Sequence, residues 1–261
     1  MVLFSEATSC ISLNNLGNYT LLRKIEQLNN SWLKFNHLLK NSLFPQACLL
    51  CSASNGVGFG ICSDCLNDLP YHNSPHCPQC GLLSFEHQLC GACIASSPDF
   101  DATKALFTYE YPVSQVLQQY KYNQQLALAE TFAGLMLETL ALENIDLIIP
   151  MPLHPSRLQE RGFNQSLEIA RIIGKRLNIK VNSQVAQRIK LSPPQASLPL
   201  KERVRNMKGA FACHEDLSGL RIALIDDVMT TGASLNALAK AVKAKGAAHV
   251  ECWLIARTLA K

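Results

Sequence analysis

Two patterns of apolar residues alternate along the second half of the chain. The run from Arg221 to Ile225 is almost wholly apolar without alternation, which is typical of a strand covered on both faces of a parallel sheet. Further strands are expected at 105–111, 146–150, 185–189 and 249–256. Apolar positions on one face predict helices at 166–177 and 234–245, and further helices are expected at 112–122, where Pro112 begins the helix, at 126–142, and in the basic segment 200–206. Strands that alternate with helices indicate an α/β fold with a parallel sheet flanked by helices.

The first hundred residues carry a different signal, a series of cysteines. Eight of the eleven cysteines form four CxxC pairs, namely Cys48/Cys51, Cys62/Cys65, Cys77/Cys80 and Cys90/Cys93. Each pair can present two thiolates to a tetrahedral Zn²⁺, so four pairs supply two Cys₄ sites. The intervening sequence is short and polar, and we therefore expect metal to replace a hydrophobic core. A disulfide framework is the alternative, and it is disfavoured in a cytosolic chain with three further cysteines.

The pairing of these cysteines stays open at the level of sequence. Neighbouring pairs are expected to share a metal, although interleaved pairing and one degenerate site are alternatives. Three histidines of the same segment are alternative ligands, namely His72, His76 and His87. The remaining cysteines, Cys10, Cys213 and Cys252, are expected to be small core or surface residues.

Composition and charge divide the chain into an N-terminal extension at 1–44, a double zinc ribbon at 45–95 and an α/β domain at 100–261. An amphipathic helix is predicted at 21–39, packed on the zinc module or, as the alternative, on a membrane surface. Apolar stretches are too short for a membrane span and no secretory signal is evident, so a cytoplasmic location is expected. Residues 147–210 hold 12 basic and 3 acidic side chains, a local excess that suggests a polyanionic ligand.

The most specific chemical signal follows the strand at 221–225. Asp226 and Asp227 come directly after the apolar run, and the turn Thr230, Thr231, Gly232, Ala233, Ser234 precedes the next helix. Open α/β sheets bind ligands at the carboxyl ends of their strands, and a turn of small residues before a helix forms a phosphate cradle. The two acids can accept hydrogen bonds from sugar hydroxyls or hold Mg²⁺. This arrangement resembles the phosphoribosyl-pyrophosphate (PRPP) motif of type I phosphoribosyltransferases; an acid pair beside an ordinary turn is the alternative.

Together with the four CxxC pairs, the segments Pro150-Met151-Pro152-Leu153 and Arg161-Gly162-Phe163-Asn164-Gln165-Ser166 resemble the ComF family of ComFC-like and GntX-like proteins. The resemblance implies a type I phosphoribosyltransferase-like domain behind a double zinc ribbon, and a role in handling single-stranded DNA during natural transformation. It also implies PRPP binding, with Asp226 and Asp227 on the ribose side and 230–234 around the 5-phosphate. Met151, Pro152 and Leu153 then correspond to the loop that receives pyrophosphate.

Basic residues near these motifs are candidate anion contacts, namely Lys121, Arg157, Arg161, Arg203, Arg205 and Lys208. Surface solubilisation is the alternative for each of them. Tyr120 and Tyr122 flank Lys121 and are expected either to stack on bases or to pack on a helix face. His154 is a weaker candidate as a donor to a leaving group.

The preferred interpretation is a cytoplasmic protein of DNA uptake that binds single-stranded DNA and PRPP. Its zinc module would dock DNA or a partner such as a helicase or channel component. The rival hypothesis is an active Mg²⁺-dependent phosphoribosyltransferase on an unidentified acceptor, and a structural adaptor is a third. The sequence does not offer an evident pocket for an acceptor base.

Overall fold

The structure is a computed structural model that describes residues 47–54, 56, 60–122, 126–190, 207 and 209–259. The chain divides into two compact units, Met1–Cys62 and Ser63–Lys261. All helices and strands given below lie in the second unit. Among the described residues, the helices are all too short or too polar to cross a bilayer. The helices predicted at 21–39 and 200–206 fall outside the described residues, so both stay predictions.

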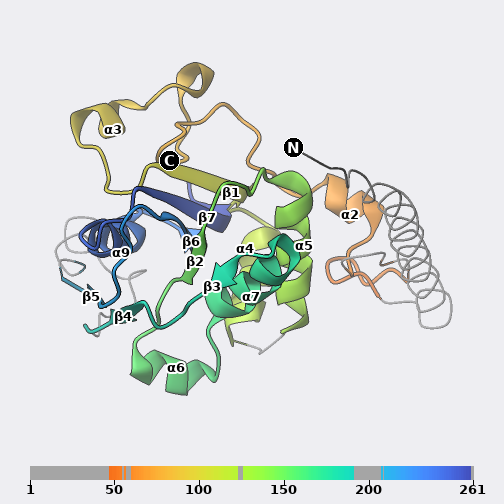
Figure 1. Ribbon diagram of the computed structural model, residues 1–261. Helices are drawn as coiled ribbons and strands as arrows, with labels where there is room; N and C mark the ends of the chain where they lie inside the picture. The colour runs from red at the N-terminus through yellow and green to blue at the C-terminus, as the bar shows by residue number, and fades with distance from the viewer. Residues whose placement is uncertain are drawn as a thin grey trace, which may run out of the picture. The chain divides into compact units, whose positions relative to one another are not determined.

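The second unit is built on a five-stranded sheet with the strand order β1-β7-β6-β2-β3, drawn in Figure 1. Every pair of neighbouring strands is parallel. The strands are β1 (Ala102–Thr108), β2 (Leu147–Pro150), β3 (Lys180–Val181), β6 (Arg221–Met229) and β7 (His249–Arg257). The central strands are buried on both faces, which explains their unbroken apolar runs. The predicted α/β class is confirmed.

Helices cover both faces of this sheet (Figure 1). Helix α9 (Ala233–Lys243) packs on one face, whereas α5 (Ala127–Thr139) and α7 (Gln165–Leu177) pack together on the other. The α9 face has a continuous apolar core, to which alternate strand residues contribute, among them Leu147, Ile149, Ile222, Leu224, Val250, Cys252 and Leu254. Full burial of each such side chain contributes roughly 1.5–3 kcal/mol.

The helices that follow the neighbouring strands β2 and β6 lie on opposite faces of the sheet, and this divergence determines where a ligand can bind. Strand β2 leads into α6 (Pro155–Arg161) and α7, while its neighbour β6 leads into α9 on the opposite face. Pro150 pairs with Ile225, and the Met151 amide donates to the Ile225 carbonyl over 2.8 Å. Such a point, where successive connections diverge, opens a crevice at the carboxyl ends of the strands.

The predicted elements agree with the observed ones except in three respects. Strand β6 continues to Met229, so Asp226 and Asp227 lie inside the strand and not beyond its end. The reason is that β7 is long enough to pair with this segment, Asp226 with Leu254 and Met229 with Arg257, and pairing outweighs the low strand propensity of Asp.

The second and third differences concern short elements. The strand expected at 185–189 is β4 (Ala186–Arg188), which forms a separate antiparallel pair with β5 (Phe211–Cys213) and not a strand of the main sheet. Several short elements are not predicted, because two to seven residues are too few to show a periodicity. They are β3, β5, α6, α2 (Ser63–Asn67), the 3₁₀ helix η1 (Phe85–His87) and α3 (Gly91–Ala95). Helix α4 (Val113–Tyr122) agrees with the prediction at 112–122.

Candidate functional site

The two adjacent acids of β6 have different partners. Asp226 accepts hydrogen bonds from the Ser166 hydroxyl (3.2 Å) and the Asp227 amide (2.9 Å). Asp227 forms an ion pair with Lys121, whose Nζ lies 3.0 Å from Oδ2. Only 22% of the Lys121 side chain and 12% of the Asp227 side chain are exposed, so this pair is largely shielded from water. One carboxylate is therefore neutralised by a cation, and the other is held only by neutral donors.

The pKa values of Asp226 and Lys121 reflect this difference in partners. Burial, together with the charge of Asp227, raises the pKa of Asp226 to about 7. Burial alone would lower the pKa of Lys121, but the charge and hydrogen bond of Asp227 raise it above its ordinary value. Asp226 thus changes its charge near neutral pH, while Lys121 stays a cation. Carboxyl groups with such raised pKa values are frequent at functional sites.

The segment Arg161 to Ser166 positions these groups from the start of α7. Asn164 is the N-cap of α7, because its side chain accepts from the Ser166 and Leu167 amides over 3.0 and 3.3 Å. Its amide nitrogen donates to the Met151 carbonyl (3.0 Å), which links α7 to the loop after β2. Gln165 accepts from Arg161 (3.3 Å) and donates to the Lys121 carbonyl (3.4 Å). A short motif therefore connects the loop after β2, the acid pair and the end of α4.

The predicted phosphate loop, residues 230–234, follows the end of β6 and includes the first two residues of α9. Gly232 is the N-cap of α9 with φ +78°, a left-handed conformation that glycine adopts without strain. The Thr231 hydroxyl accepts from the Ala233 amide over 3.3 Å, and Ser234 donates to the Met207 sulfur over 3.3 Å. The partial positive charge at the start of α9 suits an anion. Across the crevice, Met151 and Pro152 are buried and Leu153 is half-buried.

Three arginines from two elements lie near one another, and one of them, Arg188, also interacts electrostatically with Asp226. Arg157 and Arg161 lie on α6, where Arg157 pairs with Glu160 over 2.6 Å. The third is Arg188 of β4, which lies over the Phe211 ring at 5.8 Å and has a buried Nε that finds no hydrogen-bond partner among the residues that the structure describes. Burial lowers the pKa of Arg188, and the charge of Asp226 opposes that shift. Sequence reasoning missed Arg188, which nothing distinguishes before the chain folds, and it assigned no role to Ser166 although Ser166 ends the 161–166 motif.

The structure shows the surroundings of two other residues that the sequence analysis considered as ligand contacts, Tyr120 and His154. Tyr120 is fully buried against Phe132 and Phe163 and donates to the Gln165 carbonyl over 2.9 Å, so it packs on a helix face instead of stacking on a base. His154 is the N-cap of α6, where its ring accepts from the Ser156 amide. That contact gives His154 a structural role. The cations Arg203, Arg205 and Lys208 lie outside the described residues and stay sequence-based candidates.

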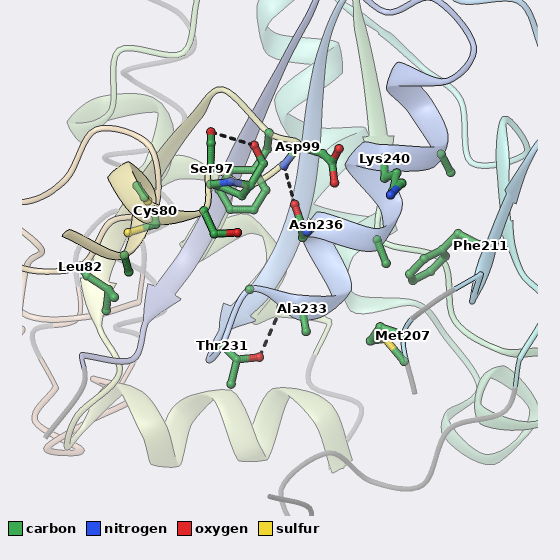
Figure 2. A pocket seen from close by; sticks show the side chains of 18 of the residues that line it. Cys80, Leu82, Ser97, Asp99, Met207, Phe211, Thr231, Ala233, Asn236 and Lys240 are labelled. Carbon is green, nitrogen blue, oxygen red and sulfur yellow. Dashed lines mark hydrogen bonds between the residues drawn. The ribbon is translucent and has the colours of Figure 1, made fainter. Parts of the chain in front are cut away.

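A pocket of about 820 Å³ borders the loop from the α9 side, as Figure 2 shows. Thr231 and Ala233 of the loop line it, together with Asn236 and Lys240 of α9 and Cys80 of the zinc module. The Asp99 amide donates to the Asn236 side chain over 2.6 Å and fixes the linker before β1 against α9. The acid pair does not line this pocket. The pocket is relevant because residues of the predicted phosphate loop form part of its wall.

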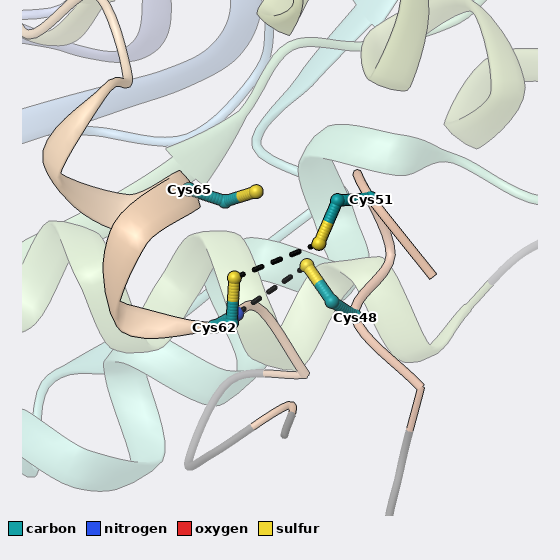
Figure 3. A group of neighbouring side chains, drawn as sticks. All are labelled: Cys48, Cys51, Cys62 and Cys65. Carbon is teal, nitrogen blue, oxygen red and sulfur yellow. Dashed lines mark hydrogen bonds between the residues drawn. The ribbon is translucent and has the colours of Figure 1, made fainter. Parts of the chain in front are cut away.

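The cysteines gather into two groups of four, and the sulfurs of each group lie within 4.8 Å of one another. Figure 3 shows the first group, Cys48, Cys51, Cys62 and Cys65. The second consists of Cys77, Cys80, Cys90 and Cys93. Neighbouring pairs are thus combined as expected, and neither group includes a histidine. Cys213 and Cys252 are buried, as small core residues are.

The sulfur distances fit a zinc ion. A tetrahedral centre with Zn–S bonds of about 2.3 Å places its sulfurs about 3.8 Å apart. The Cys51 and Cys62 sulfurs are 3.7 Å apart, and those of Cys80 and Cys90 are 3.5 Å apart, both far longer than a disulfide bond. Burial opposes ionisation of Cys48, but donors including the Leu50 and Cys62 amides lower its pKa to about 6. Such a thiolate is a good metal ligand.

Comparisons with known proteins agree with the two cysteine groups. Residues 39–94 match the family model of the double zinc ribbon domain. Among solved structures, a purine phosphoribosyltransferase from Pyrococcus horikoshii is 17% identical, with a TM-score of 0.27 over 60% of this chain and 91% of that chain. Leishmania donovani UMP synthase is 16% identical, with a TM-score of 0.28 over 52% of this chain and 22% of that one. These shape similarities are low and we base no conclusion on them.

Sequence relatives are more informative. The DNA utilization protein YhgH of Escherichia coli K12 is 31% identical over 224 residues, which are 82% of this chain and 98% of that protein. Competence protein F of Haemophilus influenzae is 29% identical over 83% of this chain and 99% of that protein. Competence protein ComFC of Bacillus subtilis is 26% identical over 76% and 84%. The chain therefore belongs to the ComF family of competence and DNA utilization proteins.

Proposed function

We propose that this chain is a cytoplasmic protein of DNA uptake that binds single-stranded DNA and carries a PRPP site between β2 and β6. Its relatives are named for competence and DNA utilization, which supports a role in the same process. The observation that carries the PRPP part is the acid pair of β6, in which Lys121 neutralises only Asp227.

The arrangement of the acids suits a ribose phosphate. The Asp226 carboxylate can accept hydrogen bonds from ribose hydroxyls, and an added donor or cation favours its charged form, which burial otherwise disfavours. The turn at 230–234 lies four to eight residues further on and presents backbone N–H groups to the 5-phosphate. Carboxylate oxygens are ligands that Mg²⁺ prefers, and Mg²⁺ would neutralise the pyrophosphate charge.

The cations beside this site suit a phosphate backbone. Four cations come from three elements: Lys121 and Arg188 lie near the acids, and Arg157 and Arg161 lie near Arg188. Electrostatic contacts of this kind bind nucleic acid with little sequence preference, and they weaken steeply with salt. The proposal therefore places DNA and PRPP at neighbouring positions, where one ligand can modulate the other.

A titration of fluorescent single-stranded DNA at two salt concentrations, with and without PRPP and Mg²⁺, tests this proposal. The Arg157→Gln/Arg161→Gln double variant should weaken binding and reduce the salt slope by about 0.7 for each DNA phosphate that the variant no longer neutralises. Arg171→Gln is the matched control, because Arg171 is 61% exposed and pairs with Glu168 on α7. Equal affinity of the double variant and the wild type would refute a DNA contact at α6. Affinity of the wild type for neither ligand would favour the adaptor hypothesis.

The rival proposal is an active phosphoribosyltransferase. In that reaction the bond between the anomeric carbon and pyrophosphate breaks, the acceptor forms the new bond, and positive charge develops on the ribose. The acid pair would stabilise this charge. Arg188 and Phe211 of the β4–β5 pair favour the rival, because a cation over an aromatic ring beside the acids provides a surface for an acceptor.

The two proposals differ in turnover. Pyrophosphate release that depends on a defined acceptor, and that Asp226→Asn/Asp227→Asn abolishes, would establish the enzyme. Binding of PRPP without turnover for any base or nucleic acid would favour the binding protein. A helicase or channel component of DNA uptake is the proposed protein partner, and co-purification with the intact chain would identify it.

A further inference from the structure

Arg257 is a buried cation that the proposed function does not use. It ends β7, pairs with Thr108 of β1 and Met229 of β6, and is only 2% exposed. No ion pair between Arg257 and a carboxylate is found in the part of the chain that the structure describes. A buried charge is costly unless it is hydrogen-bonded and compensated, so its partners reveal its role.

Those partners are four backbone carbonyls from three parts of the chain. The Arg257 Nε donates to the Cys80 carbonyl over 2.8 Å, within the second Cys₄ group. One terminal nitrogen donates to the carbonyls of Met229 (3.0 Å), Thr230 and Thr258 (2.8 Å). Thr230 begins the predicted phosphate loop. One guanidinium therefore connects a metal-ligand turn with the start of that loop.

The metal-ligand turn is also fixed to the sheet around Arg257. The Thr103 hydroxyl donates to the Gln79 carbonyl over 2.6 Å, and its amide donates to the Pro78 carbonyl over 2.9 Å. Gly81 has φ +70°, and a Cβ at this position would lie 3.3 Å from Thr103 and 3.5 Å from Arg257. This close packing leaves the turn little freedom to move without moving the arginine.

The charges of Arg257 and of the second Cys₄ group are consistent with a connection between them. Burial lowers the pKa of Arg257, and the sulfurs of Cys80, Cys90 and Cys93 oppose that shift. A zinc ion with four thiolates carries a net negative charge, because four thiolates outweigh one Zn²⁺. A filled second Cys₄ group therefore compensates the buried guanidinium that no carboxylate reaches.

We propose that Arg257 is a positioning residue that links the second Cys₄ group to the 230–234 loop, so that the loop holds a ligand phosphate more tightly when this group is filled with metal. The inference rests on the proposed function for the identity of the ligand. The geometric link between metal and loop stands independently of PRPP. Affinities of two linked sites change reciprocally, so PRPP binding should also raise the metal affinity of the second Cys₄ group by the same factor.

The test compares four variants of the full, zinc-loaded chain. Arg257→Lys keeps a charge but cannot reproduce the four contacts, and we expect about a tenfold loss of PRPP affinity, which corresponds to about 1.4 kcal/mol. Cys90→Ser removes a ligand of the second group and should give a similar loss. Two controls should change affinity by less than about twofold: Cys51→Ser in the first group, and Arg221→Lys, where a half-buried arginine binds the Asn144 carbonyl.

Combining the two effective changes provides the decisive measurement. If Arg257 transmits the effect of the metal, Arg257→Lys/Cys90→Ser should lose no more affinity than either single variant, whereas independent roles predict additive losses. Amide hydrogen exchange at 230–234 without ligand separates this inference from the proposed function. Faster exchange in Arg257→Lys and Cys90→Ser, but not in Cys51→Ser, supports the link even if PRPP does not bind. Unchanged exchange in Arg257→Lys, or an equal effect of Cys51→Ser, would overturn it.

Discussion

Replacing Asp226 by Asn should stabilise the protein while it removes the proposed PRPP binding. The amide oxygen of the introduced side chain can still accept from the Ser166 hydroxyl and the Asp227 amide, so the local geometry is retained. The substitution removes a charge that burial disfavours. Functional groups that are destabilising in the free protein are a common cost of activity.

The size of the effect follows from the pKa of Asp226. A shift from 3.8 to about 7 is roughly three units at ~1.4 kcal/mol each, which gives an upper limit of about 4 kcal/mol. Asp226 retains some solvent access and lies near Lys121, so we expect a gain of about 1–2 kcal/mol at pH 8. Because the folded-state pKa is raised, the folded protein binds the proton more tightly than the unfolded chain. The destabilisation by the Asp226 charge therefore begins as the pH rises above about 4 and reaches its full size above about 7.

Urea denaturation at pH values between about 5.5 and 8.5 measures this gain, with fluorescence of the fully buried Trp253 as one signal. The difference between Asp226→Asn and the wild type should shrink as the pH falls through 7. Asp216→Asn is the control, since Asp216 is exposed and hydrogen bonds from Ser218 lower its pKa, so no gain is expected. A loss of stability in Asp226→Asn, or a gain that does not change with pH, would refute the reasoning.

Three further predictions concern the ion pair, the packing and the metals. Lys121→Met leaves the Asp227 carboxylate largely buried without its cation, so unfolding free energy should fall by about 2 kcal/mol, and adding Asp227→Asn should restore part of it in the same urea assay. Gly174→Ala should lower the thermal midpoint, because its Cβ would lie 2.3 Å from a side-chain carbon and 2.8 Å from a backbone oxygen; Gly91→Ala, which meets nothing within 4 Å, should not. Mass spectrometry of the purified chain should find two zinc ions, and a Cys-to-Ser change in one group should leave one; two zinc ions in such a variant would argue against Cys₄ coordination.

Features carried by local sequence were predictable. The cap at Asn164, the CxxC pairs and the buried strand at 221–225 each depend on residues close together in the chain, so pattern and spacing were sufficient. The position of Asp227 within a strand was not predictable in this way, because it depends on how far the neighbouring β7 extends.

The partners of the site residues show the same limit. Lys121 and Asp227 are over a hundred residues apart, and only the order of strands and helices brings them together. Arg188 belongs to a separate antiparallel pair whose place could not be inferred from its own sequence. Arg257 is merely the last residue of an apolar strand until its carbonyl partners are known. Long-range contacts thus define the chemistry of the crevice.

Strand β6 continues through Asp226 and Asp227, so the backbone at these positions is held by strand pairing and not by the carboxylates. Backbone pairing of Asp226 with Leu254 and of Val228 with Ala256 holds this segment in place whatever its side chains are. Strand pairing therefore supplies the stability, and the carboxylates are free to change under selection. Within such a framework, a lineage can lose transfer chemistry and keep ligand binding, or regain it, through substitutions that leave the fold intact.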